Sequence, residues 1–371
     1  MRGPTVAPII IAAGGTGGHL FPAEALAAEL TSRGLRIALM TDARSGAIHS
    51  ETFASRETFV LRGAGIAGRG AFRAATAALA LGAGTFQAAT VLFRVRPAVL
   101  VAFGGYPSIP PVLGARLLRH RPSIILHEQN AVLGRANRFL ARHASLLALS
   151  FAGTARVPSG IATDFTGNPV RPAIAGLATT PYAPPTNPIR LAVLGGSLGA
   201  RVFSDIVPPA IIALPEAFRV RLHLTQQCRM EDITRVRQTY AQAGITADLS
   251  PFFADIADRL AAAHLVIARA GASTVAELAV AARPSILVPL PGAIDDHQLA
   301  NARALVTAGA ARMIPQPKFS APALTAVLID LLSNPVQLTA ASQLARSIAR
   351  PDAAARLADL VESFIPQEVR P

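Results

Sequence analysis

Two glycine-rich segments, each directly after a short apolar run, constrain the fold of this chain more than any other feature. Gly14–Gly18 follows the apolar run Ile9–Ala13, and Gly195–Gly199 follows Ile189–Leu194. A helical pattern comes next in both places. A strand, a glycine turn and a helix start together open a Rossmann-like domain. Because the pattern occurs at matching places in the two halves, we predict two Rossmann-like domains that face each other across a cleft.

Short β-rich runs alternate with helical segments along the chain, which is the pattern of a parallel sheet with crossover helices. After the first glycine turn, Pro22 suits the first turn of a helix, and Gly34 is its stop signal. The fold class is therefore α/β. The further predicted strands are Arg36–Met40, Ala98–Phe103, Ser123–His127, Leu146–Ser150, Arg219–Leu224, Leu265–Ala268 and Ser285–Val288.

The division into domains follows from a segment rich in proline and threonine. Residues 178–188 contain four prolines and show no hydrophobic period, so we predict a linker there. The N-terminal domain then covers 1–177 and the C-terminal domain 189–350. Residues 351–371 carry a further helical pattern, which we expect to pack back on the N-terminal domain.

Charge and cysteine content narrow the class of protein. The net charge is +13, and Lys318 is the only lysine, so nearly all positive charge is arginine. This points to an anionic partner, such as nucleic acid, phosphorylated metabolites or an acidic membrane, although arginine-favouring base composition explains it equally well. Cys228 stands alone, so no intrachain disulfide forms, and no signal-peptide pattern precedes the first strand. We expect a cytoplasmic protein.

An uncharged stretch, Ala74–Phe93, is long enough to span a bilayer. It consists mostly of Ala, Gly and Thr, which argues against a transmembrane helix but leaves open a helix lying on a membrane. Large apolar residues recur every seven positions and would form one stripe on a helix. Packing on the sheet is one interpretation of this stripe. We predict instead a peripheral patch that docks on anionic lipid, made of Phe72, Arg73, Leu79, Phe86 and Phe93.

Polar residues that follow the predicted strands of the first half are candidates for catalysis. His19 sits at the start of the helix after the glycine loop, where it can act on a ligand held by that loop or merely cap the helix. His127–Asn130 follows another strand, and ligands bind at the carboxyl edge of such sheets. Within His127–Asn130, Asn130 is the better ligand candidate and His127 can be a core residue. His19 is the expected base, and Glu128 is its competitor.

The second half offers a similar turn in Arg269–Glu277. Its backbone N–H groups and hydroxyls suit a diphosphate, and Glu277 could accept both hydroxyls of a ribose. Asp295–Gln298 opens a later helix, where simple N-capping by the aspartates is the alternative. The chain has no Asp-x-Asp pair and no metal-spaced His, Cys and carboxylate cluster. We expect charge at a leaving group to be met by arginine and helix ends instead of a metal.

A nicotinamide-dependent enzyme is the competing interpretation of the first half. Asp42 ends the second predicted strand, where a ribose-binding acid would sit in a dinucleotide-binding domain. The glycine pattern is incomplete, however, because Leu20 stands in place of the third glycine. This interpretation also leaves the second half unexplained.

Taken together and in order, these motifs resemble the MurG family, the UDP-N-acetylglucosamine (UDP-GlcNAc) transferases of peptidoglycan assembly. The likeness covers nearly the whole chain, through Gly14–Pro22, His127–Asn130, Gly167–Arg171, Gly195–Arg201 and Arg269–Glu277. It implies a GT-B fold and inverting transfer of N-acetylglucosamine to the 4-hydroxyl of the muramyl sugar in lipid I, which makes lipid II.

The resemblance also implies partners and site residues. UDP-GlcNAc would bind mainly the C-terminal half, and the undecaprenyl-diphosphate-linked acceptor the N-terminal half, on the cytoplasmic face of the bacterial inner membrane, with no cofactor, metal or nucleic acid. Phe253 stands where an aliphatic residue is common, so its backbone is the expected uridine contact, and His297 stands where some relatives have glutamine. The implied donor-binding residues are Thr16, Gly17, Gly18, Asn130, Arg171, Ser197, Phe253, Ala272, Ser273, Thr274, Val275, Ala276, Glu277, His297 and Gln298.

Three other functions remain open at this point. They are a different GT-B sugar transferase, a nucleotide-sugar epimerase and a non-catalytic nucleotide-binding protein. An epimerase needs neither a lipid-facing surface nor an external acceptor, and a binding protein would tolerate loss of His19.

Overall fold

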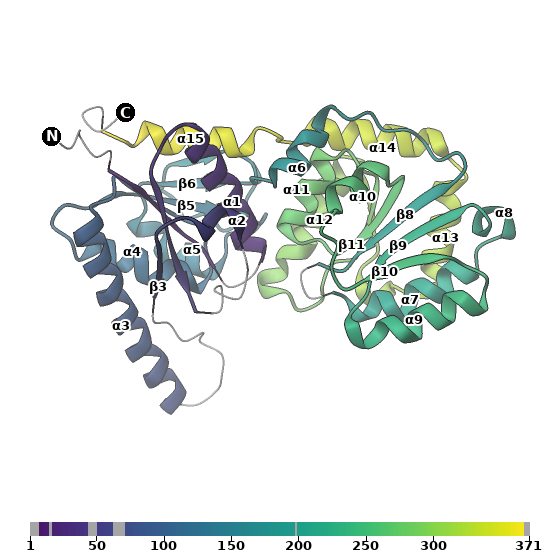
Figure 1. The fold of residues 1–371 in the computed structure, drawn as a ribbon, viewed down its shortest axis with the longest axis horizontal. Helices are drawn as coiled ribbons and strands as arrows, with labels where there is room; N and C mark the ends of the chain where they lie inside the picture. Colours follow the sequence, from purple (N-terminus) through teal and green to yellow (C-terminus); the bar gives the residue numbers. More distant parts are fainter. Residues whose placement is uncertain (1–6, 15–16, 44–49, 62–70, 197–198, 367–371) are drawn as a thin grey trace. The chain divides into compact units, whose positions relative to one another are not determined.

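The chain folds into two compact units in the computed structural model (Figure 1), which describes residues 7–14, 17–43, 50–61, 71–196 and 199–366. Unit 1 comprises residues 1–171 and 352–371, and unit 2 comprises residues 172–351. Each unit is built on one parallel sheet. The predicted α/β class with two Rossmann-like domains is confirmed.

Unit 1 contains a seven-stranded sheet in the order β3-β2-β1-β4-β5-β6-β7, and unit 2 a six-stranded sheet in the order β10-β9-β8-β11-β12-β13. In both, the first strand lies at the centre and the order reverses there, as in a Rossmann fold. The strands of unit 1 are β1 (Ile9–Ala12), β2 (Ile37–Asp42), β3 (Thr58–Leu61), β4 (Val99–Ala102), β5 (Ser123–Glu128), β6 (Leu146–Leu149) and β7 (Thr163–Phe165). Those of unit 2 are β8 (Ile189–Leu194), β9 (Leu222–Gln227), β10 (Ala247–Ser250), β11 (Leu265–Ala268), β12 (Ser285–Leu287) and β13 (Ala311–Met313).

Helices connect the strands in both units. Unit 1 has α1 (Gly17–Ser32), α2 (Glu51–Ala54), α3 (Ala71–Val95), η2 (Tyr106–Ser108), α4 (Ile109–Arg116), α5 (Arg135–Leu140), η3 (Ala141–His143) and α15 (Ala353–Ser363). Unit 2 has α6 (Pro172–Ala175), η4 (Gly176–Thr179), α7 (Arg201–Ile212), α8 (Glu216–Arg219), α9 (Met230–Gln242), α10 (Ile256–Ala262), α11 (Ala272–Val280), η5 (Ile294–Asp296), α12 (His297–Thr307), η6 (Gln316–Lys318), α13 (Ala321–Leu332) and α14 (Pro335–Ile348).

The central strand β1 shows why this sequence forms a sheet covered on both faces. Successive side chains of a strand point to opposite faces. Ile9 and Ile11 belong to one core cluster, with residues of α1 and α15. Ile10 belongs to a second cluster, with residues of α3 and α4. Because both faces are buried, the strand is a continuous apolar run instead of an alternating one.

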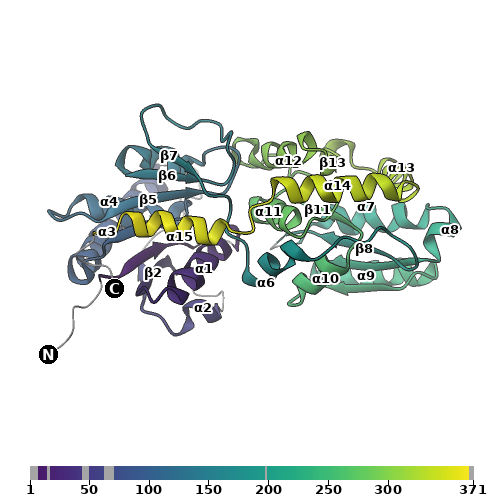
Figure 2. The same cartoon turned by 90° about the horizontal axis from the view of Figure 1, so that it is seen from above.

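The C-terminal helix α15 completes unit 1 by packing beside α1 (Figure 2). Leu357 and Val361 are fully buried in the core cluster that includes α1. At the edge of this contact, Arg33, directly after α1, donates from Nη1 to Asp359 at 2.6 Å and to Glu362 at 2.8 Å. Unit 1 is therefore assembled from the two ends of the chain.

Three of the differences from the sequence predictions concern a helix start, a strand start and a domain boundary. The helix α1 begins at Gly17, so Pro22 lies inside it and not in its first turn. The strand predicted at Arg219–Leu224 begins at Leu222, because Glu216–Arg219 forms the short helix α8. The units divide after Arg171, where the prediction places the domain end at residue 177, because α6 packs on α11 of unit 2.

The helix α3 extends beyond the sheet of unit 1 (Figure 1). Among the described helices it is the one continuous segment, Thr76–Val95, that is long and apolar enough to cross a membrane by length and composition. Its second half packs closely on α4. A Cβ atom added to Gly114 of α4 would lie 2.8 Å from the Ala89 nitrogen and 2.9 Å from the Thr85 carbonyl oxygen. The two backbones touch only because residue 114 has no side chain.

We predict that Gly114→Ala destabilises unit 1, because both neighbouring atoms belong to the backbone and cannot move away. The expected loss is about 1–2 kcal/mol after the helix-propensity gain of alanine. Gly82→Ala in α3 is the matched control, since nothing lies within 4 Å of the added Cβ, and it should stabilise by about 0.5–1 kcal/mol. Urea unfolding measures both, and equal stability of Gly114→Ala and wild type would contradict this packing.

Candidate active site

A chain of hydrogen bonds starts at His19 at the carboxyl edge of the unit 1 sheet. The His19 Nδ1 lies 2.9 Å from the Gln129 Oε1. The Gln129 Nε2 lies 3.0 Å from the Nδ1 of His127 and 3.0 Å from the Phe103 carbonyl oxygen. The His127 Nε2 in turn lies 3.1 Å from the Gly167 carbonyl oxygen. The chain links α1 to the ends of β4 and β5 and to the loop after β7.

His127 is a neutral core residue at physiological pH. Its side chain is fully buried, and its ring lies 5.1 Å from that of Phe103 between centroids. Burial lowers the pKa of His127 from its ordinary value of 6.5 to about 4, because a charged imidazolium would lose its hydration there. The role of core residue considered for His127 therefore fits its surroundings.

Glu128 holds the loop after β5 through four N–H donors. Its Oε1 accepts from the backbone and side-chain nitrogens of Asn130, at 2.9 and 3.0 Å. Its Oε2 accepts from the Gly134 nitrogen at 2.8 Å and the Asn137 Nδ2 at 2.9 Å. The side chain is buried, and each oxygen is engaged twice. These four hydrogen bonds hold Asn130 and its loop in place.

The glycines after β4 shape the space beside His19. Gly105 has a φ of +68°, and a Cβ atom placed there would lie 3.3 Å from the His19 Nε2. Gly104 has a φ of +77° and lies against the Asn137 side chain. Glycine adopts such conformations without the steric cost that other residues meet. The imidazole of His19 thus lies between Gln129 on its Nδ1 side and the bare backbone of Gly105 on its Nε2 side.

Arg171 lies in the same unit, at the end of the loop after β7. Its guanidinium stands 5.1 Å above the centroid of the Phe21 ring, and its charge lowers the pKa of Glu24, although burial of Glu24 has the larger, raising effect. Next to it, Asn168 is buried, and neither of its side-chain amide atoms has a hydrogen-bond partner within the described part of the chain. Buried amides without partners are rare, and they mark places where a ligand or water is bound.

The second glycine loop, in unit 2, is held by Gln227 at the end of β9. The Gln227 Oε1 accepts from the Gly195 nitrogen at 2.9 Å, and its Nε2 donates to the carbonyl oxygens of Gly196 and Pro251 at 2.9 and 3.0 Å. A Cβ at Gly195 would lie 2.4 Å from the Ala200 nitrogen, so no other residue fits this turn. Gln227 was not among the predicted site residues.

Residues predicted to bind the donor diphosphate begin the helix α11. Gly271 precedes it in extended conformation and supplies no side-chain cap, and a helix start of this kind is a typical place for an anion to bind. Ser273, Thr274 and Ala276 are half-buried. Ala272, Val275 and Glu277 are buried. Arg269 is turned away from this helix end, because it donates to the Val288 carbonyl oxygen at 3.0 Å and the Gln316 Oε1 at 2.6 Å.

The loop that leads into α12 is held by its own polar residues. Asp295 and Asp296 both have positive φ values, 57° and 52°, and Asp296 makes no side-chain capping bond, so simple N-capping does not account for them. The His297 Nδ1 lies 2.8 Å from the Ile294 carbonyl oxygen, and the Gln298 Oε1 accepts from the Leu290 nitrogen at 3.0 Å. These bonds hold the predicted donor-binding side chains at the helix start.

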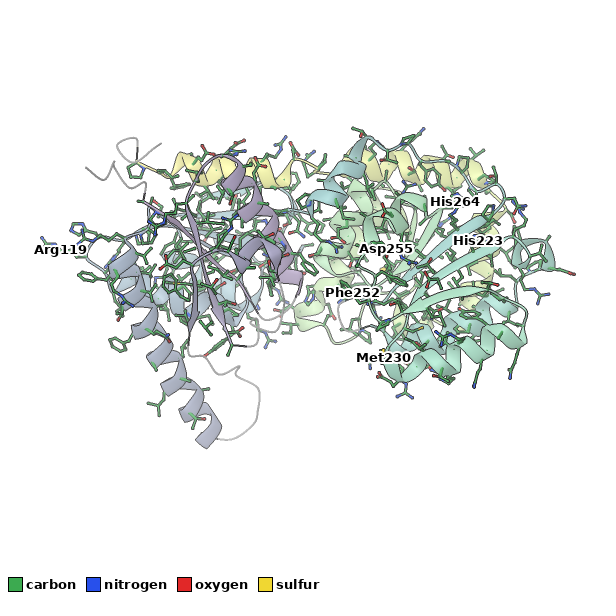
Figure 3. The ribbon with its side chains drawn as sticks, in the orientation of Figure 1. Arg119, His223, Met230, Phe252, Asp255 and His264 are labelled. Carbon is green, nitrogen blue, oxygen red and sulfur yellow. The ribbon has the colours of Figure 1, made fainter. Side chains whose placement is uncertain are left out.

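Phe253 follows β10 and lies in the sequence between Phe252 and Asp255, which Figure 3 labels. It is buried under Arg259, whose guanidinium carbon lies 4.0 Å from the ring centroid. Its side chain therefore packs internally, and the contact of its backbone with uridine stays a prediction. Of the other predicted donor residues, Gly17 is buried and Gly18 exposed at the start of α1, while Thr16 and Ser197 lie outside the described residues.

Within the described residues, no group of three His, Cys, Asp or Glu side chains could hold a metal ion. Candidate ligands for an anion are instead the first N–H groups of α11 and the arginines of unit 1.

Comparison with known proteins identifies the family. The glycosyltransferase family 28 N-terminal domain matches residues 9–149, and the family 28 C-terminal domain matches residues 190–357. The chain belongs to glycosyltransferase family 28. The fold of this family 28 enzyme is thus recognised separately in both units.

Relatives of this family 28 chain carry one common name, UDP-N-acetylglucosamine–N-acetylmuramyl-(pentapeptide) pyrophosphoryl-undecaprenol N-acetylglucosamine transferase. The protein from Granulibacter bethesdensis is 62% identical, over 96% of this chain and 94% of the relative. The protein from Acidiphilium cryptum is 53% identical over the full length of both. The resemblance to the MurG family is confirmed.

Solved structures agree with this assignment. Acinetobacter baumannii MurG superposes with a TM-score of 0.77 and 30% identity, over 96% of this chain and 99% of that one. A UDP-N-acetylglucosamine 2-epimerase from Listeria monocytogenes has a TM-score of 0.67 at 15% identity, over 96% of both chains. The second likeness concerns the fold alone.

We predict that His127 makes unit 1 sensitive to acid. Between pH 6.5 and 4 the unfolded chain binds a proton at this position that the folded chain excludes, so stability falls as pH falls. The variant His127→Phe cannot titrate there. Between pH 7.5 and 5 its free energy of unfolding should decrease by about 2 kcal/mol less than that of wild type. Urea unfolding at the two pH values measures this, and parallel pH dependence would show that His127 is not held neutral.

Proposed function

We propose that this enzyme transfers N-acetylglucosamine from UDP-GlcNAc to the 4-hydroxyl of the muramyl sugar of undecaprenyl-pyrophosphoryl-MurNAc-pentapeptide. The observation that carries this proposal is 62% identity over 96% of the chain to a transferase named for that reaction. The same reaction is expected from the two anion-type glycine turns, one for each diphosphate substrate. The epimerase alternative has only likeness of fold in its support.

In the proposed reaction the acceptor oxygen attacks the anomeric carbon of the donor as the bond to UDP breaks, which inverts the configuration. The acceptor hydroxyl must lose its proton as the new bond forms, and UDP leaves with the bonding electrons. His19 is the proposed base. Its Nδ1 is engaged by Gln129, which leaves Nε2 for the acceptor. Glu128 is the weaker candidate, because four N–H donors already occupy its two oxygens.

The donor site of the proposal lies in unit 2. The uncapped start of α11 would bind the UDP diphosphate and stabilise the charge that develops on it. Glu277 would accept from the ribose hydroxyls, and the backbone of Phe253 would contact the uracil. Ser197, Ala272–Ala276, His297 and Gln298 complete this set, and Thr16–Gly18, Asn130 and Arg171 of unit 1 are proposed to contact the donor as well. Positive charge of the protein takes the place of a metal in this scheme.

The reaction is tested by incubating the protein with labelled UDP-GlcNAc and a lipid I analogue and isolating the disaccharide lipid. We predict that product forms equally in EDTA. Loss of product in EDTA, restored by Mg²⁺, would refute metal independence.

We also predict that His19→Ala lowers kcat by about 100-fold or more, the usual contribution of a general base, while affinity for UDP-GlcNAc changes little. Glu128→Gln, which keeps the shape of the side chain, is the matched comparison. Near-normal kcat in His19→Ala with an inactive Glu128→Gln would assign the base to Glu128.

The exposed face of α3 supports a second part of the proposal, peripheral binding to the cytoplasmic face of the inner membrane. Leu79, Phe86 and Phe93 are exposed by 75%, 70% and 64%. They recur at an interval of seven residues and so lie on one face of the helix, and an exposed apolar face, unlike scattered single residues, is typical of an interaction surface. The patch also includes Phe72 and Arg73, whose side chains lie outside the described part. Cations flank it, since Arg94 lies in the last turn of the helix, Arg96 follows the helix and exposed Arg119 follows α4 (Figure 3).

We predict that Leu79→Ser with Phe86→Ser lowers sedimentation with anionic vesicles at low salt by about tenfold, because apolar area and charge act together in such binding. Val220→Ser with Val336→Ser removes apolar side chains of similar exposure, 73% and 78%, from unit 2 and should leave sedimentation unchanged. Equal binding by wild type and both variants would show that α3 is not the docking face.

A further inference from the structure

We propose that Gln129 and His127 are positioning residues that hold neutral His19 in the tautomer with its proton on Nδ1, leaving the Nε2 lone pair to act as the base. This inference rests on the proposed role of His19 as the base. It explains why Nε2 is the nitrogen that carries the lone pair. It follows from the order of donors and acceptors along one buried chain of hydrogen bonds, which runs from the Gly167 carbonyl oxygen to the His19 ring.

The first step is the tautomer of His127. Its Nε2 lies 3.1 Å from the Gly167 carbonyl oxygen, which can only accept a hydrogen bond. The Nε2 must therefore carry a proton. His127 is neutral at physiological pH because burial lowers its pKa to about 4. A neutral imidazole has a single N–H group, so its Nδ1 is an acceptor.

The second step is the orientation of the Gln129 amide. One end of this amide lies near three acceptors, the Phe103 carbonyl oxygen at 3.0 Å, the His127 Nδ1 at 3.0 Å and the His127 carbonyl oxygen at 3.1 Å. Only the NH₂ group can face them. The reversed amide would place its oxygen against three other lone pairs in a buried site, where the side chain is 1% exposed. The Oε1 of Gln129 therefore points to His19.

The third step is His19 itself. Its Nδ1 lies 2.9 Å from the Gln129 Oε1, which can only accept. The Nδ1 must donate, so the proton of neutral His19 is on Nδ1 and the lone pair is on Nε2. The hydrogen bond made by one ring nitrogen in this way decides the state of the other. Gly105 borders the Nε2 side with a bare backbone and adds no competing side chain there.

The consequence for catalysis is specific. A histidine in the other tautomer would present an N–H to the acceptor hydroxyl and could not take its proton. Elsewhere a catalytic histidine in the wrong tautomer loses up to about 10⁴-fold in kcat. Gln129 and His127 touch no reacting atom in this scheme and act only through His19.

The wild-type protein provides the first test. The chain contains 8 histidines, so long-range ¹H–¹⁵N spectra of protein labelled at histidine, assigned by single substitutions, report which nitrogen of each ring is protonated. We expect a proton on Nδ1 of His19 and on Nε2 of His127 at pH 8. A proton on Nε2 of neutral His19 would overturn the proposal without any variant having to fold.

Gln129→Met provides the second test, because it keeps the length of the side chain and removes both hydrogen-bonding groups. The Nδ1–H signature of His19 should be lost, and kcat should fall at least about tenfold, with the KM for UDP-GlcNAc unchanged. Gln226→Met is the matched control. Gln226 is also fully buried and hydrogen-bonded, to Tyr240 at 2.6 Å, but it lies in unit 2 and is not linked to His19.

The outcomes distinguish the positioning of His19 by Gln129 and His127 from the role of His19 as the base. An unchanged His19 tautomer in Gln129→Met, or an equal change in Gln226→Met, would overturn the positioning. If the tautomer depends on Gln129 as expected but His19→Ala keeps normal kcat, the positioning is upheld and His19 is refuted as the base.

Discussion

The sheet strands of this protein are covered on both faces. Polar groups therefore find hydrogen-bond partners at only a few places. The central strand β1 is fully buried, with Ile9 and Ile11 on one face and Ile10 on the other. Polar side chains therefore gather where strands end, and each must find partners among neighbouring loops. The hydrogen bonds of His127, Glu128 and Gln129 all meet this requirement. These hydrogen bonds fix the side chains at the carboxyl edge of the sheet, as the proposed orientation of His19 requires.

The two units use the same device at their first loops. In unit 1 a buried glutamine, Gln129, joins the end of β5 to His19 on the neighbouring helix. In unit 2 Gln227 at the end of β9 holds Gly195 and Gly196 of the glycine turn. An amide suits both places, because it donates and accepts at once and carries no charge that burial would penalise. These bonds hold the His19 ring in unit 1 and the backbone of Gly195 and Gly196 in unit 2.

Hydrophobic pattern and glycine turns allowed the α/β class and most central strands to be predicted, and Ile189–Leu194 and Leu265–Ala268 were bounded as observed. The four edge strands β3, β7, β10 and β13 were missed. In β7, exposed Thr163 and Asp164 lack an apolar pattern. Candidate site residues came from motifs, and His19 was preferred to Glu128 as the base from the ordinary pKa of histidine and the place of its loop. The structural reason to set Glu128 second was not visible in the sequence, because the contacts of Gly134 and Asn137 with Glu128 exist only in the folded loop. Gln227 gave no signal beyond being polar at a strand end.

The return of α15 to α1 affects how the protein is made. Unit 2 is one uninterrupted stretch of chain, whereas unit 1 needs Leu357 and Val361 from the far end to cover Leu26 and Leu30 of α1. On the ribosome the unit that is started first is therefore finished last. Until the final helix is released, the growing chain carries an uncovered apolar surface on α1, which chaperones bind and which favours aggregation. Premature termination anywhere after unit 2 would leave a complete unit 2 joined to an incomplete unit 1.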